Sequence, residues 1–210
     1  YNVSGTTTVA LPMGAVKTYA FSTEAFRQPT QIAIAATDGS VTAPATASYS
    51  NNRRQWSKTP LGGRTNYVYD QFQETSRKEG LNSGGGVMPQ TRTIQTDWHP
   101  AYSRPTERRT LNTTAALVAK SKWTHNDRGQ VVTSTQVDPV TNAERTTTTT
   151  YCEMADVAAG GNCPVLGAVK AVDGPRTDVA DVSSYSYYAS DDPACAASPS
   201  VTQPGRARRG

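Results

Sequence analysis

Five consecutive threonines, Thr146 to Thr150, stand directly before Tyr151. Threonine is branched at Cβ and loses side-chain freedom in a helix, so this run favours a β-strand. A second β-rich run extends from Gln130 to Val137, and residues 138–143 separate the two runs. In this connection Pro139 fixes its own φ, and Asp and Asn tolerate turn geometry. The segment therefore predicts an antiparallel hairpin.

A second turn precedes this hairpin. Residues Asn126 to Gly129 (Asn-Asp-Arg-Gly) follow directly after Trp123-Thr124-His125. Gly129 stands where a turn needs a positive φ, which glycine adopts without steric cost. Residues 123–151 therefore predict the order strand, turn, strand, turn, strand.

The composition extends this prediction to the rest of the chain. Hydrophobic residues make up 36% and charged residues 18% of the 210 residues, with Thr, Ser, Gly, Pro and Asn among the remainder. Such a composition suits many short strands with solvent-exposed faces better than a packed helical bundle. We expect an all-β fold, as one large domain or two small ones.

Short stretches of the chain resemble one another. Residues Tyr67 to Gln73 (YVYDQFQ) align with Trp123 to Gly129 (WTHNDRG): an aromatic, any residue, a second ring, Asp or Asn, two spacers and a turn position. Gln73 stands in place of the glycine, and residues 96–100 (TDWHP) carry the acid and the rings in another order. The leading aromatics Tyr19, Tyr67, Trp98 and Trp123 lie 48, 31 and 25 residues apart. This spacing indicates a unit of about two dozen residues stretched by insertions.

Units this short cannot bury a face alone. We expect each hairpin to pair edge to edge with the next, which gives a long antiparallel sheet that curves as the strand twist accumulates. The insertions are expected in loops at 42–50, 82–86 and 155–162, and the glycines Gly84 to Gly86 suit a hairpin tip.

These motifs together resemble the YD repeat of the Rhs family of large bacterial proteins. The stretches that carry the resemblance are YVYDQFQ, the TDWHP and RPT pair, THNDRGQV with the downstream DPVTNAERTTTTTY, and residues 169–188 (VKAVDGPRTDVADVSSYSYY). The resemblance covers most of the chain from about Tyr19 onward.

The resemblance implies a fold and a function. YD repeats build a hollow β-shell that encloses a C-terminal toxin or other cargo, and a self-cleaving aspartyl protease core closes the shell in many members. No stretch matches that core's closing motif, and no toxin domain follows the repeats. We therefore expect residues 1–210 to be a segment of shell wall, from a secreted or cell-surface bacterial protein. Its expected partners are other YD repeats of the same parent chain, an enclosed polypeptide toxin, and a secretion apparatus or a surface glycan.

The repeat residues have expected structural roles. Asp70 and Asn126 are expected to accept hydrogen bonds from turn amides, and Gly129 to take the positive φ. The rings are expected to pack across strands. The residues assigned to this structural repeat are Tyr67, Tyr69, Asp70, Trp98, Trp123, His125, Asn126 and Gly129.

No motif predicts enzymatic chemistry. A GxSxG nucleophile motif is absent, and the two histidines, His99 and His125, lie among the repeat's aromatic residues. The acid pair Asp191-Asp192 has no EF-hand loop around it and reads as a solvated turn. We therefore expect a non-enzymatic protein without catalytic residues, cofactor or metal.

Three cysteines are present and none form a CxxC pair, so a zinc site is not expected. Cys152 follows the threonine strand and Cys163 ends the next loop, a spacing that a disulfide can close. Cys195 is then free or paired outside the chain, and such cysteine usage favours an oxidising compartment.

Charge and hydropathy restrict the partners. The formal charge is +4, with 21 basic residues scattered among 17 acidic ones, so no nucleic-acid partner is expected. Arg53-Arg54, Arg108-Arg109 and residues 205–210 are typical of solvated faces or loop ends. No apolar run is long enough to span a bilayer, and residues 1–14 lack the pattern of a signal peptide. The chain begins as if within a strand, as expected of a mature product or a piece of a longer chain.

An alternative class is a carbohydrate-binding β module. Aromatic side chains on an exposed sheet can stack on sugar rings. The residues that would do so are Trp56, Trp98 and Tyr102.

Overall fold

The computed structural model describes residues 5–22, 27–158, 163–187 and 207–209. Within these ranges the fold is all-β and antiparallel, as predicted, and the helical content is a single 3-10 turn, η1 (Pro12–Gly14), and the short helix α1 (Met154–Ala158). No helix among the described residues has the length and apolar character that crossing a membrane requires.

The chain divides into two compact units: the first comprises Tyr1–Ser103 and Arg108–Ala119, and the second Arg104–Glu107 and Lys120–Gly210. The division falls within β9 (Pro105–Leu111) and β10 (Leu117–His125).

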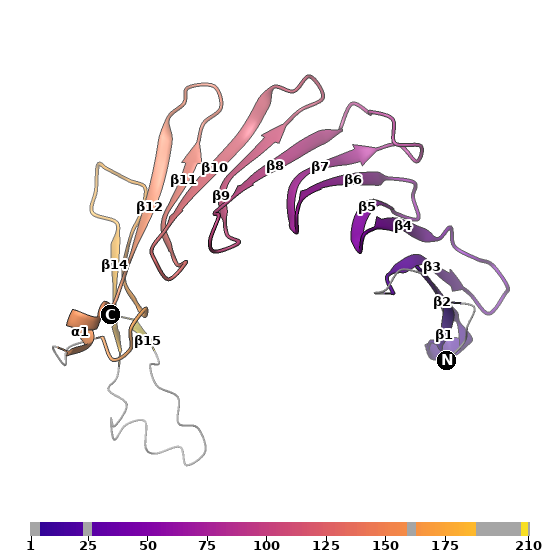
Figure 1. Cartoon of the computed structure of the whole chain (residues 1–210), viewed down its shortest axis with the longest axis horizontal. Helices are drawn as coiled ribbons and strands as arrows, with labels where there is room; N and C mark the ends of the chain where they lie inside the picture. Colours follow the sequence, from indigo (N-terminus) through magenta and orange to yellow (C-terminus); the bar gives the residue numbers. More distant parts are fainter. Residues whose placement is uncertain (1–4, 23–26, 159–162, 188–206, 210) are drawn as a thin grey trace, which may run out of the picture. The chain divides into compact units, whose positions relative to one another are not determined.

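The first unit is a sheet whose strands pair in sequence order. Its strands are β1 (Thr6–Ala10), β2 (Val16–Phe21), β3 (Pro29–Ala35), β4 (Ala45–Ser50), β5 (Arg53–Lys58), β6 (Arg64–Asp70), β7 (Gln73–Leu81) and β8 (Arg92–Trp98). Each strand from β1 to β7 pairs antiparallel with the next. Within this unit the strands follow one another along a curve (Figure 1), as expected from accumulated strand twist.

The second unit is built in the same way. Its strands are the C-terminal part of β10, β11 (Val131–Val137), β12 (Glu144–Tyr151), β13 (Val169–Asp173), β14 (Val182–Tyr187) and β15 (Ala207–Arg209). Each pairs antiparallel with the next. The predicted hairpin of 130–151 is therefore present as β11 and β12, with threonines paired to threonines across it.

Two expected loops contain regular structure. Residues 45–50 form strand β4 within the stretch 42–50, and α1 occupies part of the stretch around 155–162. β4 alternates Thr46, Ser48 and Ser50 with Ala47 and Tyr49. These small polar residues resemble loop composition, and only the period-two pattern and the pairing with β5 mark them as a strand.

One five-residue turn recurs at one end of the first unit's sheet. The amide of its first residue donates to the carbonyl four residues later, and the amide of its fourth residue donates back to the first carbonyl. It begins at Leu11, Ala36, Thr59, Asn82 and Asn112, which are 25, 23, 23 and 30 residues apart. The fourth residue is a glycine in the first four turns, with φ between 79° and 91°, where glycine avoids a steric cost, and it is Ala115 with φ 62° in the fifth. The unit of about two dozen residues is therefore two strands and two turns.

Few side chains are buried in either unit. Among the described residues the buried apolar ones are Leu81, Ile94, Val137, Cys152 and Cys163, accompanied by Thr91, Thr96 and Thr135. Leu81 and Ile94 lie in the first unit and Val137 in the second. Because the core is this sparse, cross-strand contacts and turns must supply much of the stability.

The two faces of the first unit differ in chemistry. Side chains alternate along a strand, so the strand registers assign each residue to one face. The face that we call the aromatic face carries Ile32, Ile34, Tyr49, Arg54, Tyr67, Tyr69, Glu74, Arg77, Ile94, Thr96 and Trp98. The opposite face, the polar face, carries Ser48, Trp56, Lys58, Arg64, Asn66, Val68, Ser76, Lys78, Thr93 and Gln95.

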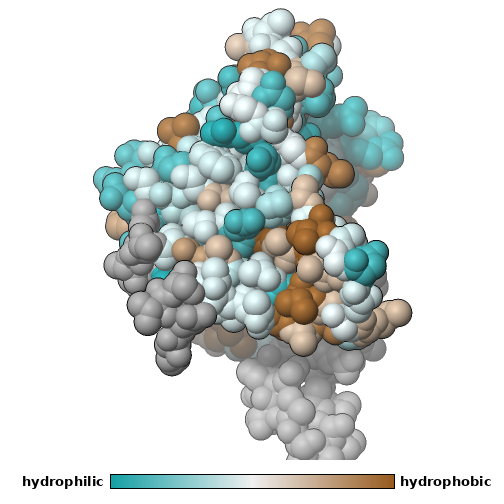
Figure 2. All heavy atoms as spheres, turned by 90° about the vertical axis from the view of Figure 1, so that its right-hand side faces the viewer, coloured by the Kyte–Doolittle hydropathy of each residue, from teal (hydrophilic) through white to brown (hydrophobic). Residues whose placement is uncertain are grey.

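Apolar side chains are also exposed at the β1 side of the first unit. Figure 2 views the molecule from the right-hand side of Figure 1 and shows brown, hydrophobic residues gathered in a patch. The exposed apolar side chains of β1 to β3 are Val9, Val16 and Ile34. Among the described residues β1 pairs with β2 and with no other strand, so its other edge is an edge of the sheet.

Candidate functional site

Three hairpins carry the same contact between an aromatic side chain and the backbone. Trp98 Nε1 donates to the carbonyl of Glu74 at 2.9 Å, Tyr151 Oη to that of Val131 at 2.7 Å, and Tyr187 Oη to that of Val169 at 2.8 Å.

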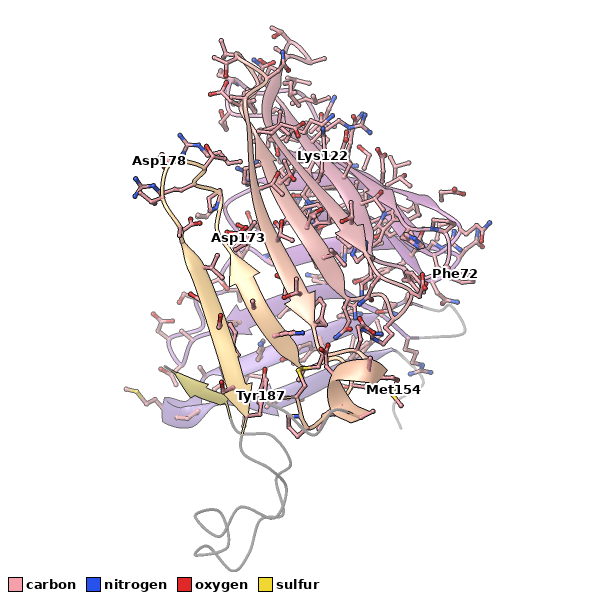
Figure 3. The ribbon with its side chains drawn as sticks, turned by 90° about the vertical axis from the view of Figure 1, so that its left-hand side faces the viewer. Phe72, Lys122, Met154, Asp173, Asp178 and Tyr187 are labelled. Carbon is pink, nitrogen blue, oxygen red and sulfur yellow. A yellow bond between two sulfur atoms is a disulfide. The ribbon has the colours of Figure 1, made fainter. Side chains whose placement is uncertain are left out.

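In each case the ring is on the last residue of a strand, and the carbonyl is at the start of the strand before it. The predicted packing of repeat aromatics across strands thus includes a hydrogen bond to the neighbouring backbone, which we call the aromatic clamp. Figure 3 labels Tyr187 at the end of β14.

The predicted turn at Asn126 and Gly129 has the expected bonds. Asn126 Oδ1 accepts from the amides of Arg128 and Gln130, each at 3.0 Å, and Gly129 has φ 72°. Asn82 and Asn112 accept the equivalent pairs of amides in their own turns. The sequence analysis assigned this role to Asp70 and Asn126 and missed Asn82 and Asn112, although an Asn stands at the start of all three of these turns.

Asp70 ends β6, but its turn differs from the one at Asn126. Asp70 pairs with Gln73, so only two residues connect β6 to β7, and Gln71 takes the positive φ of 48°. Gln73 is the first residue of β7, not a turn residue. The alignment of Gln73 with Gly129 was therefore wrong, because the two connections differ in length.

The other repeat residues lie in different settings. Tyr67 and Tyr69 share the aromatic face of the first unit, whereas Trp123 and His125 end β10 in the second unit. His99 stacks on Tyr102 with ring centroids 4.4 Å apart.

The candidate sugar-binding residues do not form one platform. Trp56 lies on the polar face with the guanidinium of Arg64 4.6 Å from its ring, and Trp98 lies on the aromatic face. Tyr102 is engaged with His99. A glycan cannot stack on Trp56 and Trp98 together, so the structure gives the carbohydrate-binding alternative no common surface.

Arginine and tyrosine side chains form a cluster on the aromatic face that the sequence did not predict. Arg54 lies 5.7 Å from the ring centre of Tyr49 and 5.9 Å from that of Tyr67. Its Nε and Nη2 donate to Tyr49 Oη at 3.4 and 3.3 Å. This contact raises the pKa of Arg54 above its usual range. Tyr67 Oη is in turn 3.1 Å from Ser57 Oγ.

An open recess of about 410 Å³ lies at this cluster. Its lining includes Tyr49, Arg53, Arg54, Tyr67, Phe72 and Glu74. Tyr69 also lines this recess. Its pKa is raised, mainly by burial and then by the nearby Glu74 carboxylate, so its hydroxyl stays protonated at neutral pH. A second recess of about 200 Å³ on the same face shares Glu74 and includes Arg77, Ile94 and Trp98.

The second unit has a hydroxyl-rich face between β10 and β12. Thr124 and Thr133 join through their Oγ1 atoms at 2.6 Å, and Thr135 and Thr146 at 2.8 Å. On the same face Lys122, labelled in Figure 3, pairs with Glu144 at 2.6 Å, and this contact raises the pKa of Lys122. The threonine run thus supplies cross-strand hydrogen bonds.

A disulfide joins Cys152 to Cys163 at the start of the β12–β13 connection, next to α1 (Figure 3). The same connection is tied to the turn at Asn126. Arg128 donates two bonds to Glu153, at 2.8 and 2.7 Å, and lowers the pKa of that carboxyl. Gln130 Nε2 donates to the carbonyl of Gly167 at 2.8 Å. The disulfide therefore belongs to a cross-linked end of the second unit.

Several predicted features fall outside the described residues. Cys195, the acid pair Asp191-Asp192 and part of the loop at 155–162 are among them. In the part of the chain that is described, no three His, Cys, Asp or Glu side chains come close enough to hold a metal ion.

Comparisons with known proteins rest on structure. No family model matches the sequence, and no curated protein matches it. The fold is similar to part of a chain in the crystal structure of TcdB2-TccC3-Cdc42, with a TM-score of 0.58 and 12% identity, over 85% of this chain and 9% of that one. It is also similar to part of a Tc holotoxin pore of Photorhabdus luminescens carrying a TccC3 substitution, with a TM-score of 0.56 and 10% identity, over 83% of this chain and 8% of that one.

Both neighbours are Tc toxin chains by name, and at these identities the likeness is one of fold. The chain spans less than a tenth of the length of each. It therefore has the fold of a small part of a much larger toxin-complex chain.

Proposed function

We propose that this chain is a non-enzymatic wall segment of an Rhs-type shell that encloses a toxin or another polypeptide for export or delivery. The observation that carries the proposal is the sheet itself: hairpins pair in sequence order, bury few side chains, and repeat one turn every two strands. Such a sheet extends by adding hairpins and needs no compact core of its own.

Three further observations support a wall. The fold resembles parts of toxin-complex chains, in line with the YD-repeat resemblance of the sequence. The outer edge of β1 has no partner in the described chain and suits continuation by a neighbouring strand. The aromatic clamps and the recurrent turns fix the hairpins to one another.

We propose that the aromatic face of the first unit contacts the enclosed polypeptide, which we call the passenger. It carries Ile32, Tyr49, Tyr67 and Ile94, whereas the polar face carries many hydroxyl, amide and basic side chains. A partly unfolded polypeptide exposes both apolar and charged groups, and a face with rings and guanidinium groups can contact both. The disulfide suits the oxidising surroundings of a secreted or cell-surface protein.

Photocrosslinking from adjacent residues on opposite faces tests this function. Tyr69 and Val68 are neighbours in β6, with Tyr69 on the aromatic face and Val68 on the polar face. Benzoylphenylalanine replaces one or the other in the protein as its cell produces it. We expect crosslinks to an enclosed polypeptide from position 69 and none from position 68, identified by mass spectrometry. Crosslinks from neither position, or equally from both, would contradict an enclosing wall with this orientation.

A further inference from the structure

The recess beside Arg54 holds two guanidinium groups without acidic partners. Among the described ion pairs, Arg77 and Arg92 contact Glu79, Arg109 contacts Asp97, and Arg128 contacts Glu153. Arg53 and Arg54 instead face rings: Arg53 lies 5.0 Å from the centre of Phe72, and Arg54 lies over Tyr49 and Tyr67. Rings can hold a guanidinium in place while leaving its charge uncompensated.

Arg54 retains hydrogen-bonding capacity. A guanidinium has five N–H donors, and the two bonds to Tyr49 Oη use its Nε and Nη2 groups. The remaining donors suit a planar, two-oxygen acceptor, which guanidinium binds in a bidentate manner. The rings of Tyr49 and Tyr67 already restrict the rotamers of Arg54, so binding a ligand costs less side-chain entropy.

The surroundings favour a carboxylate on a polypeptide over a nucleic-acid backbone. Glu74 lines the same recess, so a continuous polyphosphate bound at Arg54 would meet a carboxylate there. The rings of Tyr67 and Phe72 also line the recess, and Ile94 lines the next one. A segment of protein that alternates acidic and apolar side chains matches this pattern.

We propose that the recess formed by Arg53, Arg54, Tyr49 and Tyr67 binds carboxylate side chains of an acidic segment of the enclosed polypeptide. The proposal rests on the enclosing function proposed above and adds the chemistry of the contact. It assigns Arg54 the role of hydrogen-bond donor to the bound carboxylate, and Glu74 the role of limiting the negative charge that the recess accepts.

Binding of a defined acidic peptide tests the proposal. The probe is fluorescein-labelled decaglutamate, titrated with the 210-residue protein at low ionic strength and followed by fluorescence anisotropy. We expect Arg54→Gln to weaken binding about tenfold or more, because a charge-assisted bidentate contact is lost. Glu74→Gln should tighten binding several-fold, since it removes the nearest negative charge. Arg145→Gln changes the net charge equally at an exposed site in the second unit and should have little effect.

The outcomes separate the possibilities. Equal weakening by Arg54→Gln and Arg145→Gln, or tighter binding of inorganic polyphosphate than of decaglutamate, would overturn the proposal. Circular dichroism checks that each variant folds. If Arg54→Gln loses the β-strand signal, Arg53→Gln is tested in its place, because the cation–π contact of Arg53 is with the exposed ring of Phe72. If the crosslinks from position 69 form but Arg54→Gln binds normally, the recess proposal fails and the enclosing function stands. Decaglutamate binding that depends on Arg54, without any crosslinks to an enclosed polypeptide, would contradict the enclosing function and with it the enclosed polypeptide as the ligand.

Discussion

Replacing Trp98 with alanine should lower the free energy of unfolding of the first unit by about 3 kcal/mol. The half-buried indole closes the end of the β7–β8 hairpin and donates to the carbonyl of Glu74. Its removal opens a space beside Ile94 and Thr96 and leaves that carbonyl without its donor. Urea unfolding followed by far-ultraviolet circular dichroism measures the loss.

Two variants separate the parts of this effect. Trp98→Phe keeps most of the ring but removes the N–H, so it should lose about 1 kcal/mol, the usual net value of one hydrogen bond. Trp56→Ala removes a ring of the same type from the polar face, where its described contact is with Arg64, and should lose only about 1 kcal/mol. Equal losses of unfolding free energy from Trp98→Ala and Trp56→Ala would show that the aromatic clamp of Trp98 adds no stability beyond that of the Trp56 ring on the polar face.

Removal of the Cys152–Cys163 disulfide should destabilise the second unit by about 3 kcal/mol. The two residues are 11 apart in sequence, and the closed loop restricts the unfolded chain. The double variant Cys152→Ser, Cys163→Ser should also increase hydrogen exchange at the end of β12 and the start of β13, because the backbone bonds of Cys152 to Ala168 and Gly167 lie beside the bridge.

The reductant response provides the control for this prediction. Dithiothreitol should shift the urea midpoint of the parent protein to that of the double variant and leave the variant unchanged. If parent and variant unfold at the same urea concentration, the bridge does not stabilise the unit, and the contacts of Arg128 and Gln130 alone hold this end together.

The sequence predicted the strands where local chemistry is strong. The threonine run forms β12, and Asn126 with Gly129 forms the turn that its residue types require. These features depend on near neighbours in the chain, namely branching at Cβ, Asx hydrogen bonds and positive φ. The period of about two dozen residues was also readable, because two strands and two turns repeat.

The faces could not be predicted, because they depend on bulges. Arg54 and Trp56 are two residues apart and would share a face in a regular strand. The register shift after Ser48 pairs Tyr49 with Arg54 and Ser48 with Trp56, which places Arg54 and Trp56 on opposite faces. This irregularity brings Arg54 to the face of Tyr67, whereas the registers from β5 to β8 place Trp56 on the face opposite Trp98. No residue in the sequence marks the irregularity.

Electron cryo-microscopy of the protein as its cell produces it would show whether this chain lies in the wall of an enclosing shell. We expect a closed shell in which this chain forms part of the wall, with density for the enclosed polypeptide against Tyr67 and Tyr69. A particle without an enclosed space, or a passenger against Val68 and Trp56, would contradict it.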